Sequence, residues 1–224
     1  MAGSRLAQRY AAIGAEFEAG DADVVCVQEV FSYAHLRMLA RRMPSFPQVS
    51  YRRSGVGPAG GLVTFSRSAM ASVRYTGFGM PPRADRLPAL ERLRAGFKGV
   101  LVTRLAEPGL TIVNVHPLAN RDGDWSPGGR FYPWHQAQLA MLADVVRGIA
   151  GPVVACGDFN VTGGSSLFAG FIAGTGLADV FAGDCPATFR AEYLPAGTPT
   201  SVIDFILAGA GVRAEAATVL CERN

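Results

Sequence analysis

Apolar positions along this chain follow two patterns, one of short continuous runs and one of helical spacing. The two runs richest in valine, DVVCVQEV and PVVACGDFN, predict buried strands that end in polar residues. In the opening segment Leu6, Tyr10, Ile13 and Phe17 recur at helical spacing and predict an amphipathic helix. Because strand and helix patterns alternate along the chain, the sequence is typical of an α/β protein.

The same patterns predict the remaining elements. Helices are expected over residues 4–19, 32–43, about 133–149 and about 165–174. Further strands are expected in GGLVTFSR, in a hairpin that turns at Pro108-Gly109, in SVIDFIL and in the tail at 212–221. A surface loop or short helix is expected over 80–96, and a polar glycine-rich loop over 120–130.

Two strands share a further feature at their ends. One closes on Gln28-Glu29 and the other on Asp158-Asn160, and a strand-and-helix pattern surrounds each. The recurrence suggests two similar halves that pack sheet on sheet with helices outside. The polar strand ends would then meet at one rim of the molecule, where binding sites usually lie.

Composition favours one folded domain over residues 1–224 and sets limits on its partners. Hydrophobic residues make up 49% and charged residues 17% of the 224 positions, which excludes a disordered chain. The net charge of +3 is compatible with a phosphate-bearing substrate but too small to indicate nucleic-acid binding. No CxxC pair, signal-peptide core or membrane-spanning run is present, so we expect a soluble, cytoplasmic protein, or a secreted one if the true N-terminus lies upstream.

Five polar residues lie at strand ends or within strands, namely Glu29, His116, Asp158, Asn160 and Asp204. Hydrolysis of a phosphate ester needs a divalent cation, an activated water and stabilisation of the leaving oxygen. Carboxylate and amide oxygens are ligands that Mg²⁺ prefers, and histidine is the usual proton carrier near neutral pH. Taken singly, Glu29 has an even chance of being an edge residue, His116 suits a buried structural histidine, and 157–160 suits a plain turn. Asp204 inside an apolar strand needs a partner, which favours a functional role.

Together these segments resemble the endonuclease/exonuclease/phosphatase superfamily. The resemblance rests on DVVCVQEV, GGLVTFSR, NVHPLAN, GDFN and SVIDFIL, which occur in the family's order from about residue 6 to the end of the chain. It implies a four-layer α/β sandwich of two mainly antiparallel sheets flanked by helices, with the site at one rim. It also implies a Mg²⁺-dependent phosphodiesterase, in which Mn²⁺ is possible as the cation, acting on a phosphodiester of a lipid, a small molecule or a nucleic acid.

The resemblance also assigns roles by position. Glu29 corresponds to the metal-binding glutamate and Gln28 to the neighbour that supports it. His116 corresponds to the histidine that hydrogen-bonds the scissile phosphate. Asp158 and Asn160 correspond to the pair that polarises the attacking water and holds the phosphate or leaving group. Asp204 corresponds to the aspartate that orients a catalytic histidine.

Within the superfamily, the chain is most similar to the neutral sphingomyelinase branch. SGVGPAGGLVTFSR, FKGVLVTRL and HPLANRDGDW carry this similarity. Lys98 and Asn114, with Gln28, are counted as supporting residues, although a solvated Lys98 is an equal alternative. Trp125 would either line a substrate cleft or pack its own loop. His135 is interpreted as a helix-surface or packing histidine.

The chain departs from the family pattern at both ends. The family begins with a strand that carries an asparagine ligand and ends with a Ser-Asp-His segment that holds the general-base histidine, and neither occurs here. We therefore expect a domain incomplete at both termini, in which Asp204 has no imidazole to orient. Losing a general base typically lowers the rate by about 10²–10⁴. No protein partner is implied.

Three functions remain open on these grounds. The first is hydrolysis of a sphingomyelin-like lipid or small phosphate ester, and the second is hydrolysis of DNA by the same chemistry. The third is binding without catalysis on an impaired enzyme scaffold. Six arginines that could contact DNA phosphates motivate the second function: Arg52, Arg53, Arg83, Arg86, Arg92 and Arg94.

Overall fold

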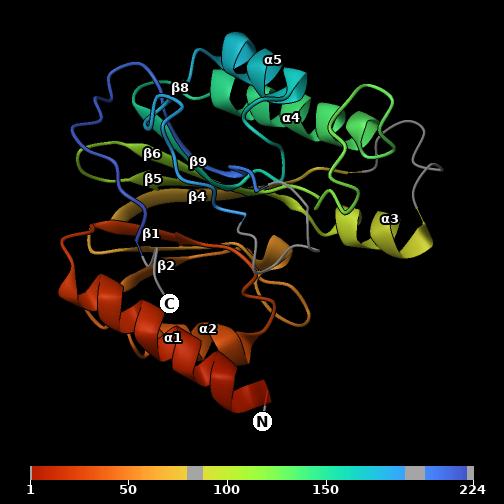
Figure 1. The fold of residues 1–224 in the computed structure, drawn as a ribbon. Helices are drawn as coiled ribbons and strands as arrows, with labels where there is room; N and C mark the ends of the chain where they lie inside the picture. The colour runs from red at the N-terminus through yellow and green to blue at the C-terminus, as the bar shows by residue number, and fades with distance from the viewer. Residues whose placement is uncertain (1, 80–87, 190–199, 221–224) are drawn as a thin grey trace.

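Two β-sheets pack face to face, and helices cover their outer faces (Figure 1). The computed structural model describes residues 2–79, 88–189 and 200–220. Within these ranges the smaller sheet has three strands in the order β1-β3-β2, and the larger has six in the order β4-β5-β6-β7-β9-β8. The layers run from α1 and α2 through the two sheets to α4 and α5, so the expected four-layer sandwich is confirmed.

The elements have the following bounds. The strands are β1 (Val24–Val27), β2 (Gln48–Ser50), β3 (Val63–Ser66), β4 (Met70–Gly77), β5 (Gly99–Leu105), β6 (Thr111–His116), β7 (Val153–Asp158), β8 (Ala178–Asp179) and β9 (Asp204–Ala208). The helices are α1 (Ala2–Ala19), α2 (Tyr33–Ala40), α3 (Ala89–Gly96), α4 (Tyr132–Arg147), α5 (Ser166–Thr175) and the 3₁₀ turn η1 (Ala59–Gly61).

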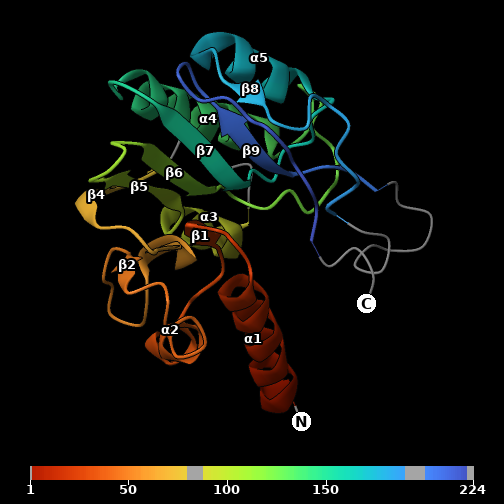
Figure 2. The ribbon, with the colours of Figure 1, turned by 90° about the vertical axis from the view of Figure 1, so that its left-hand side faces the viewer.

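Connectivity explains why the large sheet is mixed. β5 and β6 form the expected antiparallel hairpin, and β7 runs antiparallel to β9. β6 and β7 are parallel, and α4 joins them by crossing over the sheet, as a parallel connection requires. This crossover brings the C-terminal ends of β6 and β7 to the same edge of the sheet (Figure 2).

Apolar spacing places each helix on its sheet. Leu139, Leu142 and Val146 of α4 are buried against the larger sheet, and α5 adds three more buried apolar residues. On the other side, α1 packs Ile13 and Phe17 against a core formed mainly by the smaller sheet and α2. These two cores are separate because each lies between one sheet and the helices that cover its outer face.

The structure corrects several expectations. The tail over 212–220 forms no strand, because β9 already has β7 on one side and β8 on the other. The two halves are not similar in size, since one sheet has three described strands and the other six. β2 and β4 were not predicted. α2 ends at Ala40 rather than at 43.

Candidate active site

The end of β1 is fixed by a buried polar tie between the two sheets. Asn114, fully buried in the middle of β6, accepts a hydrogen bond from Gln28 Nε2 at 2.8 Å. Its own amide donates to the backbone oxygen of Val63 in β3 at 3.0 Å. Because hydrogen bonds are directional, this tie sets where residue 29 lies relative to the end of β6.

Glu29 follows this tie and lies exposed at the strand end, with a left-handed backbone at φ 64°. Non-glycine residues rarely adopt this conformation, and when they do they cluster at functional sites. The backbone N–H of Phe31 donates to the Glu29 oxygen at 3.0 Å, and that of Val30 donates to Gly61 at 3.0 Å. The turn therefore holds the carboxylate at the rim while the chain leaves the strand.

His116 ends β6 and is paired with the lysine that precedes β5. In the register of the hairpin Gly99 lies opposite His116, which places Lys98 beside the imidazole. Lys98 Nζ lies 3.0 Å from each ring nitrogen of His116. Burial, with a contribution from Lys98, lowers the pKa of His116 to about 3, so the ring is neutral at pH 7 and accepts a hydrogen bond from the ammonium.

Lys98 itself is tuned by the same surroundings. Burial lowers the pKa of Lys98 to about 8, and the negative charges of Asp158 and Glu29 oppose that decrease. The side chain therefore remains mostly cationic at neutral pH. A partly desolvated cation beside a neutral histidine suits the binding of a phosphate oxygen.

The turn at the end of β7 contains Asp158 and Asn160, and the buried Phe159 between them holds the turn against the core. Phe159, fully buried, packs its ring against Phe168, Phe171 and Phe205. Asp158 Oδ1 accepts a hydrogen bond from the backbone N–H of Asn160 at 2.8 Å, which closes the turn. With the phenyl ring held in the core, the polar residues on either side stay at the sheet edge.

Asp158 lies next to His116, with Oδ2 3.7 Å from Nε2. Because the imidazole is neutral, this contact is not an ion pair. Burial raises the pKa of Asp158 to about 7, and the charge of Asp204, its partner in the β7–β9 register, adds to the shift. A carboxyl group with a pKa near neutrality is suited to accept a proton from water.

Asn160 is buried and its backbone is left-handed at φ 53°. Its side-chain amide donates to the backbone oxygen of Pro117 at 3.3 Å, next to His116. Trp125 reaches in from the glycine-rich loop and donates from Nε1 to the Asn160 oxygen at 2.9 Å. Of the two roles considered for Trp125, the structure shows it packed against the core beside the GDFN turn.

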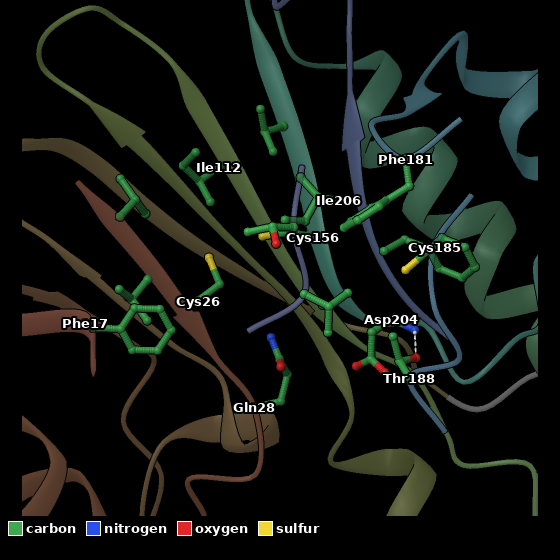
Figure 3. A pocket seen from close by; sticks show the side chains of 17 residues that line it. Phe17, Cys26, Gln28, Ile112, Cys156, Phe181, Cys185, Thr188, Asp204 and Ile206 are labelled. Carbon is green, nitrogen blue, oxygen red and sulfur yellow. Dashed lines mark hydrogen bonds between the residues drawn. The ribbon is translucent and has the colours of Figure 1, made fainter. Parts of the chain in front are cut away.

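Asp204 faces a different space from Glu29. It lines an apolar cavity of about 450 Å³ between the sheets, together with Gln28, Cys26 and Cys156 (Figure 3). Burial raises its pKa, and a hydrogen bond from Thr188 acts in the opposite direction. Thr188 Oγ1 also accepts from the Asp204 backbone N–H at 3.2 Å. Within the described residues no histidine is bonded to Asp204, so its role in orienting one stays a prediction.

The open cleft of the site has a volume of about 560 Å³ and shares no lining residue with the cavity between the sheets. The predicted residues therefore fall into three groups. Glu29, Lys98 and His116 line the cleft, and Asp158 contacts His116 without lining the cleft. Gln28 and Asp204 line the cavity between the sheets.

Several neighbours of the site could not be identified from the sequence. Thr188 lies in an irregular loop, and no motif includes Glu91 or Arg121, which join Arg94 at the cleft. Arg83 and Arg86 fall outside the described residues. The two other histidines lie elsewhere: His135 is buried in α4, which confirms packing, and His35 is half-buried against Tyr10.

The oxygen donors suit a hard divalent cation. Within the described ranges no three His, Cys, Asp or Glu side chains come together as a metal cage. Mg²⁺ does not require one, since it commonly binds through one or two carboxylates and keeps several waters. Asp158 carries a raised pKa in part because Asp204 and Glu29 are negative, and such clustered negative charge favours a cation. Glu29 is the exposed donor in the cleft, and Asp158 lies beside His116, which also lines the cleft.

Comparison with known proteins adds family and fold. The family model described as "Endonuclease/Exonuclease/phosphatase family" matches residues 1–223. Protein angel homolog 2 of Mus musculus is 34% identical over 178 residues, which is 71% of this chain and 30% of that protein. The chain thus spans about 30% of the length of this curated relative.

Solved structures share the fold at low sequence identity. Sphingomyelinase C from Streptomyces griseocarneus has a TM-score of 0.68 at 20% identity and covers 92% of this chain and 76% of its own. A mutant of beta toxin from Staphylococcus aureus with bound magnesium ions has a TM-score of 0.69 at 18% identity, covering 92% and 77%. Among the described helices, none is both long and apolar enough to cross a bilayer.

Proposed function

Because this chain belongs to the endonuclease/exonuclease/phosphatase family, we propose that it is a Mg²⁺-dependent phosphodiesterase that hydrolyses a phosphate ester by attack of water. One observation carries the proposal: Glu29, Lys98, His116 and Asp158, which come from distant parts of the chain, gather around one edge of the sheets. A purely structural ion pair would join Lys98 and Asp158 directly. Here a neutral, buried His116 contacts both residues, and such a pair alone would not require this histidine.

The residues divide the work as follows. Lys98, with its ammonium against His116, holds a non-bridging oxygen of the phosphate, and His116 donates a hydrogen bond to the phosphate from its protonated ring nitrogen. Asp158, with a pKa of about 7, accepts the proton of the attacking water. Asn160 holds the loop at Pro117 and keeps this group in place.

Glu29, supported by Gln28, would hold the cation, with the carboxylate of Asp158 nearby. When bound, Mg²⁺ would supply charge neutralisation at the phosphate and leaving oxygens. Gln28 keeps Glu29 at the rim through its bond to Asn114. The positive charge of the cation would also offset the repulsion among the carboxylates of Asp158, Glu29 and Asp204.

We infer a sphingomyelinase-like class of substrate, a phosphodiester of a lipid or small molecule. The sequence segments around the cleft and the shared fold of sphingomyelinase C support this class. A DNA substrate is the second candidate, and exposed Arg94 and Arg121 at the cleft favour it. A steep loss of DNA binding with added salt would support the DNA substrate, since it reports phosphate contacts.

Hydrolysis of bis-p-nitrophenyl phosphate tests the catalytic proposal on the full chain. Glu29→Gln and Asp158→Asn should each lower the Mg²⁺-dependent kcat/KM by at least about 10²-fold, because a metal ligand or a general base is lost. Asp144→Asn is the matched control, since Asp144 lies exposed on α4 and, within the described part of the chain, forms its ion pair with Arg147. Circular dichroism should show unchanged folding in all three variants.

The opposite results have clear meanings. Equal turnover in the wild type and in either site variant would refute the assignment of Glu29 or Asp158. Absence of turnover in the wild type, with phosphate esters still bound, would favour the third candidate, a binding protein on an impaired scaffold.

A further inference from the structure

Three apolar side chains stand exposed in the same cleft as the catalytic group. Phe31, Val56 and Phe97 are 51%, 77% and 65% exposed, and all three line the cleft with Lys98 and His116. They come from the turn after β1, the glycine loop before β3 and the residue before Lys98. Solvent exposure of two phenyl rings and a valine at one site is costly unless something apolar covers them.

The ring of Phe31 is held in place rather than free. It lies against Gly61, where an added Cβ would come within 2.8 Å of Phe31 Cε1. Lys98 also lies near this ring, with Nζ 6.0 Å from the centroid of the Phe31 ring. The apolar wall therefore begins beside the cation that faces His116.

Phe97 is the more exposed of the two phenylalanines. The backbone oxygen of Phe97 accepts a hydrogen bond from the Tyr75 hydroxyl at 3.1 Å, which fixes the chain just before Lys98. The phenyl side chain, in contrast, is largely exposed at the end of α3. Phe97 thus precedes Lys98 in sequence, and Phe31 and Phe97 both line the cleft with Lys98.

The charges of the cleft fit a single anionic group. Among the described residues, three cations line it, Lys98, Arg94 and Arg121, against the carboxylates of Glu29 and Glu91. Glu91 Oε1 lies 2.7 Å from Arg94 Nη1 and 3.1 Å from Arg121 Nε, so the two arginines are already paired. The small remaining positive charge matches one phosphodiester better than a polyanion.

We propose that Phe31, Val56 and Phe97 form an apolar subsite beside the phosphate position, which binds an apolar organic group esterified to that phosphate. The inference rests on the proposed function, because it places the phosphate at Lys98 and His116. The bound group would cover the exposed rings and leave its phosphate next to the cations. These three residues then determine specificity, while the catalytic group lies deeper in the cleft.

Phosphodiesters that share a leaving group measure this specificity directly. The p-nitrophenyl esters of methyl, octyl and phenyl phosphate, and of thymidine 5′-phosphate, differ only in the second alcohol. We expect the octyl or phenyl ester to exceed the methyl ester in kcat/KM by about tenfold or more, since covering an apolar group of this size is worth about that factor. Preference for octyl would identify an aliphatic chain, and preference for phenyl an aromatic group.

Variants locate the preference in the subsite. Phe97→Ser and Val56→Ser replace well-exposed side chains and should reduce the ratio of octyl to methyl ester kcat/KM to about threefold or less, as should Phe31→Ser. Val73→Ser on β4 is the matched control, because Val73 is 46% exposed but lies outside the cleft lining. Its ratio should equal that of the wild type.

A binding measurement separates this inference from the proposed function. Isothermal titration calorimetry with octyl phosphate, phenyl phosphate and methyl phosphate requires no turnover. Tighter binding of octyl or phenyl phosphate that is lost in Phe97→Ser would support the subsite even if no ester were hydrolysed, and only the proposed function would then fail. Hydrolysis with equal kcat/KM for all alkyl esters, or a preference for the thymidine ester, would overturn the subsite and leave the hydrolase standing.

Discussion

His135 should make the fold sensitive to acid at a point that supports the cleft. The ring is fully buried in α4, and Nε2 donates to the backbone oxygen of Leu118 at 2.7 Å. Gln138, one turn further along α4, accepts from the Leu118 N–H at 3.0 Å. The pair holds the segment that follows His116, and Leu118 itself lines the cleft.

The size of the effect follows from the pKa of His135. Burial lowers the pKa to about 4, partly offset by the bond to Leu118, whereas an unfolded histidine has a pKa of about 6.5. The unfolded chain therefore binds the additional proton first as pH falls. The stability that His135 contributes is complete above about pH 6.5 and is lost progressively toward about pH 4. Linkage gives a loss of about 2 kcal/mol at about pH 5.

Urea unfolding of the wild type and His135→Gln, with chelator present, measures this loss. Glutamine keeps a donor for Leu118 and does not titrate. Other groups titrate in both proteins: His116 shifts stability in the same direction as His135, and Asp158 in the opposite direction, because its raised pKa favours the protonated folded state. Their effects cancel in the difference between the two proteins.

The expected result is a free energy of unfolding that falls more steeply in the wild type between about pH 7.5 and 5, by about 2 kcal/mol. His35→Gln reports the effect of removing a histidine at the contact of α1 and α2, away from the cleft. Parallel profiles for the wild type and His135→Gln would refute the reasoning.

Three further substitutions probe the frame of the site. Gly157→Ala should cost at least about 2 kcal/mol in urea unfolding, because φ is 137° and a Cβ would lie 2.2 Å from the Val115 oxygen. Trp125→Phe should cost about 1 kcal/mol by the same measurement, since the bond to the Asn160 oxygen is lost. Asn114→Ala should cost about 2 kcal/mol and also reduce kcat/KM for bis-p-nitrophenyl phosphate, because the sheets lose the buried tie that lies next to Glu29.

The layers of the fold could be predicted from apolar spacing because burial decides them. Tyr10, Ile13 and Phe17 face the core from α1 as their spacing requires. The valine-rich runs form the strands β1 and β7, whose residues are buried or half-buried. Such patterns are local in sequence, because each helix or strand can bury its apolar face against any apolar surface.

Edges of the sheets could not be predicted in this way. β4 exposes most of its side chains, so it lacks the apolar run that marks a buried strand. The tail at 212–220 has enough apolar residues to suggest a strand, yet the sheet has no free position beside β9. Pairing depends on which edges remain open, and that information is not local.

The polar residues of the site could be predicted from the sequence, whereas the apolar residues that line the cleft could not. Glu29, His116 and Asp158 follow apolar strands, where an isolated polar group is costly, so the sequence marks them. Phe31 and Phe97 are ordinary apolar residues in sequence, and only their exposure in the cleft distinguishes them. The separation of Asp204 from the cleft likewise depends on how the sheets face each other.

Asn114 explains why the polar residues meet although apolar packing is not directional. Apolar contacts would allow the smaller sheet to shift over the larger one at little cost, since the hydrophobic effect depends on area rather than on direction. The bonds from Gln28 to Asn114 and from Asn114 to Val63 allow only one alignment. A fully buried amide with satisfied partners is costly to misplace. The fold therefore sets the layers, and this amide sets the register in which Glu29 comes to lie across from His116.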